Sequence, residues 1–391
     1  MKNNENSGFS QYLSFEKHIR KGDWDAANQF INSHTEAVSA RISILGSTAL
    51  HIAIFAGHLN IVEELVKIMW EESLKIKDIG DYTVLGCCAL VGNIQMAKCI
   101  IGRCRSLLSI GNRSEDLIPV VVALTYNSNG IEIARYLYSE TPIEHLKGIN
   151  GAMFITRAIY SKALDMALDL LQHYPKLAIA RDCHGQSPVE VLAGISFAYR
   201  SESRFIFWQQ WIYDSICISP AYATNQIPIS LQKSETERSE IDQIYELKLL
   251  HHLSNKLLLH MCEVLPGLSW EQLENGMVIT AIIKAVTQGH VEFVSAVLNV
   301  CPELIWCAEA SRNQNIFMLV VLHRQDEVFR HLYKYSAKNS IFGRADGVGN
   351  SILHITAMFE PSARRNTVPG AAFLMQREVQ WYKNSDSFGQ R

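Results

Sequence analysis

The stretch TALHIAIFAGHLNIVEELV, residues 48–66, decides the fold that the sequence predicts. It reads as two short amphipathic helices joined at Gly57, because glycine enters the left-handed conformation that ends a helix without a steric penalty. Neither helix is long enough to be stable alone, and neither hides its apolar stripe within the pair. Such a hairpin must stack on copies of itself, so the sequence should contain repeats.

Copies of this hairpin recur along the chain at intervals close to 35 residues. Each copy has small or apolar residues two, five and six positions after its start, and two apolar pairs further on. Nine starts fit this pattern, at positions 13, 48, 83, 117, 152, 187, 280, 315 and 351. The glycine between the two helices recurs in register at Gly22, Gly57, Gly92 and Gly289. Agreement over this length indicates a repeat array.

The array is interrupted after its sixth copy. Residues 197–213 are unusually aromatic and are expected to cover the end of the first six repeats. Residues 219–240 carry two prolines and then a charged run, which is typical of a linker. We therefore expect a first block at 1–218, a flexible linker at 219–240, and a second block at 241–391 with a long helix, three repeats and a final helix. The predicted fold class is an all-α repeat solenoid in two blocks.

The composition is that of a folded protein, and the net charge gives no electrostatic reason to expect binding to nucleic acid. Hydrophobic residues make up 48% of the chain, charged residues make up 19%, and the formal net charge is −3. Nine cysteines at irregular spacing favour free thiols in a reducing compartment, so a cytoplasmic location is expected. The longest apolar runs fall far short of the roughly 18 residues that cross a bilayer.

The hairpin at residues 48–66 resembles the ankyrin repeat, whose signature T-P-L-H-x-A appears here as T-A-L-H-I-A. The later segments FWQQWIY, IYELK, NIFMLVVLHRQ and GAAFLMQREVQWYK resemble plant ankyrin-repeat proteins of the PGG-domain family; they lie at 207–213, 244–248, 315–325 and 370–383. This resemblance implies an ankyrin solenoid with a role in stress or defence signalling at membranes. The family's Pro-Gly-Gly module and membrane spans would follow residue 383, and this sequence lacks them. We therefore do not infer a membrane location from the resemblance.

No pattern in the sequence predicts catalysis, a metal site or a cofactor. The chain has no C-x-x-C pair, phosphate loop, dinucleotide fingerprint or nucleophile elbow. His51 and His354 occupy the fourth position of the repeat motif, and His58 and His290 follow loop glycines. We interpret these four rings as bonded to the backbone of a neighbouring repeat. The DCHG sequence at 182–185 resembles an acyltransferase motif only superficially and is interpreted as the turn of a hairpin.

The predicted function is a non-catalytic scaffold that binds other proteins, and full-length relatives are among the candidate partners. The expected location is the cytoplasm, or the cytosolic face of a membrane to which partners attach the protein. Ankyrin stacks contact partners along their hairpin tips and first helices. Arg157 falls on a core slot of its repeat, so it either reaches the groove edge or meets an acidic partner. The register places the other candidate contacts at Phe55, Tyr82, His184, Gln186, Gln288 and Phe359. The alternative function is the soluble part of a multi-span membrane protein whose spanning region is absent from this sequence.

Overall fold

The computed structural model describes residues 10–112, 115–202, 205–218, 239–358 and 376. The chain divides into two compact units, unit 1 (Met1–Ala163) and unit 2 (Leu164–Arg391). Both units are helical, and within the described ranges the only strand-like pairing is an isolated bridge between Ala308 and Asn315.

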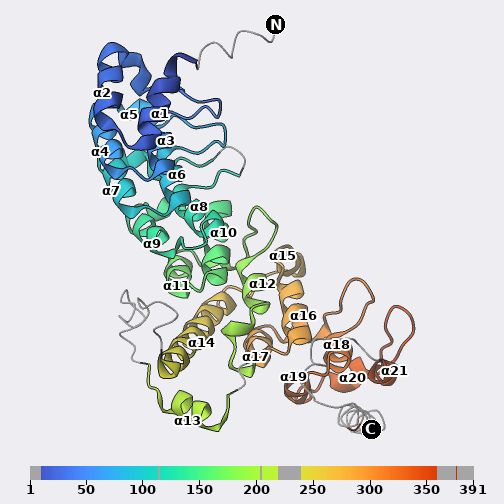
Figure 1. Ribbon diagram of the computed structural model, residues 1–391. Coiled ribbons are helices and arrows are strands. Elements are labelled where there is room, and N and C mark those ends of the chain that lie inside the picture. Colours follow the sequence, from blue (N-terminus) through green and yellow to red (C-terminus); the bar gives the residue numbers. More distant parts are fainter. Residues whose placement is uncertain (1–9, 113–114, 203–204, 219–238, 359–375, 377–391) are drawn as a thin grey trace. The chain divides into compact units, whose positions relative to one another are not determined.

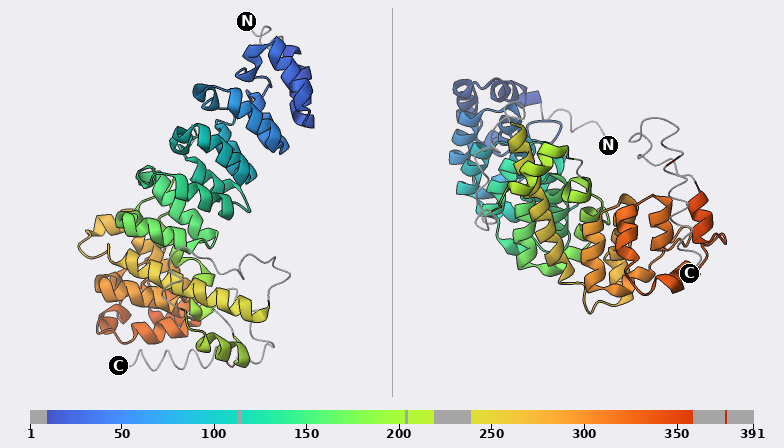
Figure 2. Two further views of the ribbon diagram at one scale, coloured as in Figure 1. Left: turned by 90° about the vertical axis from the view of Figure 1, so that its left-hand side faces the viewer. Right: turned by 90° about the horizontal axis from the view of Figure 1, so that it is seen from below.

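Unit 1 is a stack of helix pairs in two layers (Figure 1). The helix that follows each long loop is called an inner helix, and these helices pack side by side: α1 (Leu13–Lys21), α3 (Ala49–Ala56), α6 (Val84–Val91), α8 (Pro119–Tyr126) and α10 (Gly148–Tyr160). The outer helices form the second layer: α2 (Trp24–Ser33), α4 (Leu59–Ile68), α7 (Ile94–Arg103) and α9 (Ile131–Glu140), with the short α5 (Glu71–Leu74) after α4. The blue-to-green helices in the left view of Figure 2 show these pairs in succession.

The second repeat shows why such a sequence forms a hairpin of helices. Thr48 precedes α3 and caps its first turn, and Gly57 ends the helix in the left-handed conformation with φ 81°. Leu50, Ala53 and Ile54 are fully buried at the positions that the register assigned to the core. The other three loop glycines also have positive φ, so the prediction of their role as helix terminators is confirmed.

Two loop glycines should differ in their sensitivity to alanine. A Cβ at Gly57 would contact nothing within 4 Å, so Gly57→Ala should cost only backbone strain, about 1 kcal/mol. A Cβ at Gly289 would overlap the side chain of Gln325, whose Nε2 donates to the carbonyl of Thr287 at 2.7 Å. Gly289→Ala should therefore cost about 2 kcal/mol or more. Urea unfolding of the two variants measures the difference, and equal losses would contradict this account.

Unit 2 repeats the two-layer plan. Its inner helices are α12 (Pro188–Ala193), α16 (Val278–Gln288), α18 (Ile316–Leu322) and α21 (Ile352–Ala357). Its outer helices are α11 (Leu164–His173), α14 (Glu240–Cys262), α17 (Val291–Val300) and α19 (Asp326–Leu332). Three further helices are α13 (Phe207–Ser215), α15 (Trp270–Asn275) and α20 (Lys338–Phe342). The orange-to-red helices in the right view of Figure 2 show the later pairs.

The sixth repeat is assembled from helices that are far apart in the sequence. Its inner helix, α12, packs against α16 and also against α14. The 23-residue helix α14 packs in turn against the outer helices α11 and α17. It therefore takes the outer position of the sixth repeat, although residues 194–239 intervene between α12 and α14. The interruption of the array lies inside a repeat.

The division into units falls elsewhere than the boundary expected from the sequence. It lies between Ala163 and Leu164, whereas the sequence predicted two blocks separated by a linker at 219–240, most of which is outside the described residues. The physical reason is that helices from both sides of that segment share one core, since α11 and α12 pack against α14 and α16. The predicted final helix at about 370–383 lies almost wholly outside the described residues.

Candidate interaction surface

His51 makes a buried polar contact between two repeats. Its Nδ1 accepts a hydrogen bond from Thr48 Oγ1 at 2.8 Å, and its Nε2–H donates to the carbonyl of Tyr82 at 3.2 Å. Burial lowers the pKa of His51, and the bond to the Tyr82 carbonyl only partly opposes that shift. The ring is therefore neutral, and it links two neighbouring repeats by a hydrogen bond to the backbone, as predicted. His354 repeats the local half of this arrangement, with Nδ1 2.8 Å from Ser351 Oγ.

Polar side chains in the loops between paired helices bind four of the repeats to the repeat before them. In each case a side-chain N–H donates to a backbone carbonyl near the end of the preceding inner helix. The four bonds are His58 to Arg20 at 3.0 Å, Asn127 to Ala89 at 3.2 Å, His290 to Ala193 at 2.8 Å and Gln325 to Thr287 at 2.7 Å. The prediction for the two histidines is confirmed, while the asparagine and the glutamine were not recognised from the sequence.

Large side chains are exposed at the ends of four adjacent inner helices in unit 1; Tyr160, at the end of α10, is 45% exposed beside the guanidinium of Arg157, and the other three stand on α3, α6 and α8. Phe55 is 51% exposed near the end of α3, Val91 is 42% exposed at the end of α6, and Tyr126 is 47% exposed at the end of α8. The three helices pack in this order, each beside the next (Figure 1). Single exposed apolar residues are normal on any surface, but these three come from consecutive repeats whose inner helices pack side by side, which makes them a candidate patch. We call these three side chains the ladder.

The inner helices that carry the ladder have no charged side chain. They read ALHIAIFA, VLGCCALV and PVVVALTY, without Asp, Glu, Lys or Arg, and their one histidine is the neutral His51. Glu115, in the loop before α8, accepts a hydrogen bond from the Tyr126 hydroxyl at 2.7 Å. The ladder is therefore apolar along its length, with a carboxylate at its α8 end.

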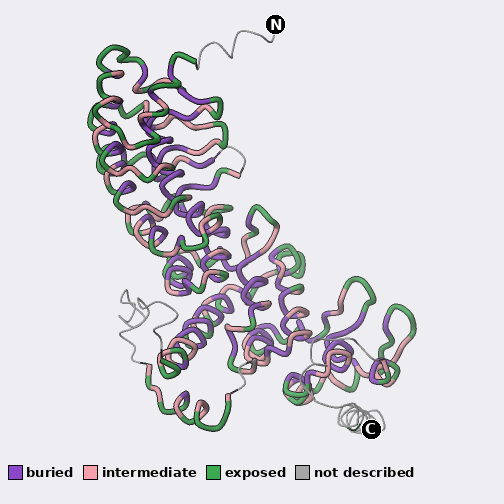
Figure 3. Tube along the Cα trace, viewed as in Figure 1, coloured by how far each residue is buried: buried purple, intermediate pink, exposed green. Residues whose placement is uncertain are grey.

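The loop tips of unit 1 add a second apolar patch. Ile44, Leu45 and Ile79 are 76%, 56% and 73% exposed. The first two tips are held together because the backbone N–H of Ile79 donates to the carbonyl of Leu45 at 2.8 Å. Figure 3 shows these loops exposed at their tips and buried where they join the inner helices.

The three residues of unit 1 that the sequence proposed as partner contacts lie in different environments. Phe55 belongs to the ladder, while Tyr82 is half-buried and serves through its backbone carbonyl as the partner of His51. Arg157 does not occupy the core slot that the sequence assigned to it. Lys162 takes the left-handed loop position with φ 63°, and the Ala163 N–H bonds to the Ala158 carbonyl.

This loop geometry shifts the register of the fifth repeat by one residue. Fully buried Ala158 fills the core slot, and half-buried Arg157 lies beside it with its guanidinium 5.6 Å from the ring centre of Tyr160. The interpretation that Arg157 reaches the groove edge fits this position, whereas its assignment to a core slot was wrong.

The candidate contacts of unit 2 are separated between a hairpin turn and an inner helix. His184 is exposed, and its backbone N–H and that of Gln186 both donate to Asp182 Oδ1 at 2.9 Å. Gly185 has φ 79°, so the interpretation of DCHG as a turn is confirmed. Gln288 is half-buried at the end of α16. Phe359 lies outside the described residues.

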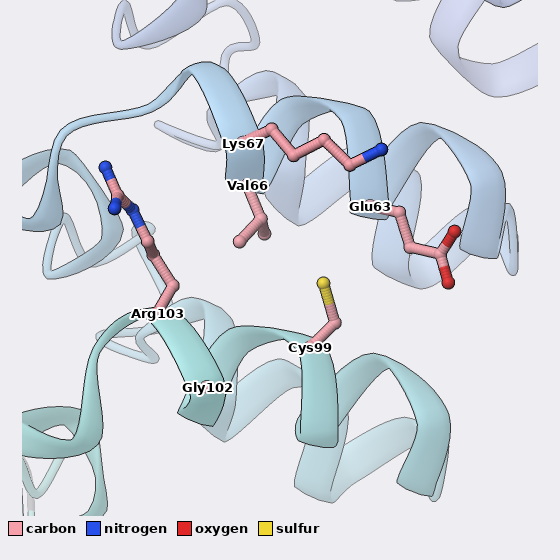
Figure 4. Close-up of a pocket in the computed structure, with 6 residues that line it drawn as sticks. All are labelled: Glu63, Val66, Lys67, Cys99, Gly102 and Arg103. Atoms are coloured by element: carbon pink, nitrogen blue, oxygen red, sulfur yellow. The ribbon is translucent and has the colours of Figure 1, made fainter.

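A groove of about 520 Å³ lies between the outer helices α4 and α7. Its lining residues are Glu63, Val66, Lys67, Cys99, Gly102 and Arg103. Figure 4 shows Cys99 directed toward Val66, with Glu63 and Arg103 toward opposite ends. Burial raises the pKa of the Cys99 thiol, and Glu63 raises it further. The thiol is therefore protonated at neutral pH, which makes it a poor nucleophile.

The aromatic segment before the predicted linker is only partly buried: Tyr199 is 2% exposed and packs against His290 and Phe293, whereas most of α13 faces solvent. On α13, Phe207 is 90% exposed, Trp211 is 69% exposed, and Trp208 is 37% exposed. Tyr213 is the buried residue of this helix, and its hydroxyl lies 2.7 Å from His251 Nδ1 on α14. The other aromatic side chains of α13 are left exposed, because Tyr213 is the residue of this helix that is buried.

Unit 2 should lose stability in mild acid because of His251. Burial lowers its pKa from 6.5 to about 4, against the raising effect of Glu292 and with a lowering effect of Arg200. The unfolded chain binds a proton near pH 6.5 and the folded chain does not, so stability is full above pH 6.5 and falls as pH drops toward 4. The loss should reach about 3 kcal/mol. In urea unfolding, His251→Gln should flatten this pH dependence, and an unchanged slope would contradict the assignment.

The described residues contain no group of three or more His, Cys, Asp or Glu side chains that could hold a metal ion. In the same part of the chain, no helix combines the length and apolar character that crossing a lipid bilayer demands.

A match to one family model supports the repeat interpretation. Residues 45–69 match the family model of the ankyrin repeat. None of the curated protein sequences matches the chain. Among solved structures, the ankyrin repeat domain of Bcl-3, a unique member of the IkappaB protein family, is similar with 18% identity and a TM-score of 0.37; the match covers 46% of this chain and 80% of that chain.

The matched repeat and the helix pairs of both units define the class of the protein. Each unit is an all-α stack of helix pairs, and one pair matches the ankyrin repeat, so the predicted all-α repeat fold class is confirmed in this respect. Ankyrin repeats generally mediate binding between proteins.

Proposed function

We propose that this chain is a non-catalytic scaffold that binds another protein through the ladder of unit 1. The observation that carries the proposal is the run of three adjacent inner helices without a charged side chain, each of which exposes a large apolar group. A surface of this kind gains free energy when a partner covers it, at roughly 25 cal/mol per Å² of apolar area. Large aromatic side chains are also enriched among the residues that dominate binding energy at interfaces.

The finer parts of the hypothesis rest on resemblance. Likeness of the segments at 207–213, 244–248, 315–325 and 370–383 to the PGG-domain family supports a role in plant stress or defence signalling. The same likeness supports the alternative that the chain represents part of a multi-span membrane protein. Neither refinement alters the ladder as the proposed contact surface.

A charge placed on the ladder should abolish partner binding without unfolding the protein. Val91 is the last residue of α6, where a lysine suits the negative end of the helix dipole, so Val91→Lys should fold normally. A buried, unpaired ammonium should weaken binding at least tenfold, or about 1.4 kcal/mol. The measurement selects peptides from a random display library on the full chain and then compares their affinities for the variants.

Ile68 provides a matched control for this experiment. It is the last residue of the outer helix α4 and is 47% exposed, nearly the same as Val91. Ile68→Lys should leave the affinity of the selected peptides unchanged. A selection that yields no peptide sensitive to Val91→Lys would rule out the ladder as the binding surface.

A further inference from the structure

We infer that the partner segment that binds the ladder is an amphipathic α-helix with apolar residues seven positions apart and basic residues beside them. This inference rests on the proposed function, because it assumes that the ladder is the contact surface. It goes further by assigning the secondary structure, the residue spacing and the charge of the partner.

The spacing of the ladder favours a helix over an extended segment. Its side chains stand on α3, α6 and α8, which pack side by side, and packed helices lie about 8–10 Å apart. In an α-helix, seven residues advance about 10.5 Å and return to nearly the same face. Three residues of an extended strand advance about 10 Å, but they land on opposite faces. One face of a helix of about 15 residues therefore matches the spacing of the three inner helices that carry Phe55, Val91 and Tyr126.

The absence of charge on the inner helices sets the character of the partner's contact face. A charged partner side chain at any of the three positions would lose its water without an opposite charge on α3, α6 or α8. The residues at these positions of the partner should therefore be apolar.

The charges around the ladder favour basic residues on the partner's flanks. The inner helices follow their loops in the same sense, so α3, α6 and α8 present their carboxyl ends together, and each helix end carries a partial negative charge. The carboxylate of Glu115 adds a full negative charge beside Tyr126. In the neighbouring loops, Lys77 is paired with Asp81 at 3.5 Å and donates to the Gly111 carbonyl. Arg157 on α10, the inner helix beside α8, carries a positive charge next to Tyr160, so the attraction for lysine or arginine on the partner helix comes from Glu115 and from the ends of α3, α6 and α8.

Three synthetic 18-residue peptides test this inference on the full chain by fluorescence anisotropy. The first has leucine at positions 2, 9 and 16, lysine beside each leucine, and alanine and glutamine elsewhere. The second has the same composition with the leucines at positions 2, 5 and 8. The third has the first spacing with glutamate in place of lysine. We expect the first peptide to bind at least tenfold more tightly than either of the others.

Variants of the chain connect this binding to the ladder. Val91→Lys should weaken the first peptide at least tenfold, while Ile68→Lys should not change its affinity. Glu115→Gln should weaken it about threefold and reduce the salt dependence of its affinity. Circular dichroism of the peptide should show that helix content rises on binding.

The outcomes separate this inference from the proposed function. Failure of the first peptide to bind, or equal binding of the second peptide, would overturn the helical partner. The proposed function would survive that result if library peptides without a seven-residue spacing still lost affinity for the Val91→Lys variant. If no library peptide lost affinity for the Val91→Lys variant, both the helical partner and the proposed function would be wrong.

Discussion

Replacing Ala53 with arginine should unfold unit 1 and leave unit 2 folded. Ala53 is fully buried between the inner and outer helices of the second repeat, and an arginine there must open the stack or bury an unpaired charge. The cost should exceed about 4 kcal/mol, because burial of an unpaired charge is among the most destabilising changes known. Hydrogen–deuterium exchange followed by mass spectrometry should show loss of protection across α1 to α10.

The same experiment decides where the cooperative boundary lies. Residues 164–215, which hold α11 to α13, should keep their protection in the Ala53→Arg variant, because α11 and α12 pack against α14 and α16. The sequence-based boundary predicts that these residues unfold together with the first block. Loss of protection in α11 and α12 would therefore favour the boundary at 219–240, and loss across the entire chain would refute both divisions.

Replacing Leu257 with aspartate should unfold unit 2 through its sixth repeat. Leu257 is fully buried on α14, the helix that supplies the outer position of the repeat begun by α12. A carboxylate at that position has no route to solvent, so the loss of stability should again exceed about 4 kcal/mol. Exchange protection should fall in α11, α12 and α16, although residues of α11 and α12 precede Leu257 by more than 60 positions.

Leu259 on the same helix supplies the control. It is 51% exposed two residues further along α14, so Leu259→Asp should change the free energy of unfolding by less than about 0.5 kcal/mol. If Leu257→Asp removed protection only from α14 itself, the helix would not be part of the sixth repeat.

The repeat pattern was predictable because each hairpin carries its own local signals. Left-handed glycines mark the helix ends at Gly22, Gly57, Gly92 and Gly289, and the apolar periodicity identifies the buried face of each helix. The fifth repeat shows the limit of this method. Its left-handed residue is Lys162, which gives no signal in the sequence, so the register slipped by one residue and placed Arg157 in the core.

The composite sixth repeat could not be predicted for a different reason. Periodicity identifies α14 as a helix, but it does not say which inner helix pairs with it. The sequence therefore suggested that the array stops at α12 and begins again later. Packing of α14 against α11, α12 and α17 shows that a long insertion separates the two halves of a single repeat. Local patterns do not encode such pairings between distant segments.

The candidate contacts were only partly predictable because exposure depends on neighbouring repeats. Phe55 was recognised from its register, whereas Val91 and Tyr126 stand one position further along their helices and were missed. Their common feature, an apolar residue at the end of a helix without charges, is visible in the sequence once the helix ends are known. The exposed aromatic residues of α13 were misjudged, because Tyr213 is the residue of this helix that is buried.

Exchange footprinting of the peptide complex tests the central claim most directly. When the lysine-flanked peptide binds the full chain, protection should rise in the last turns of α3, α6 and α8 and should not change in the outer helices α4 and α7. Protection confined to α4 and α7, around the groove that contains Cys99, would show that the ladder is not the binding surface.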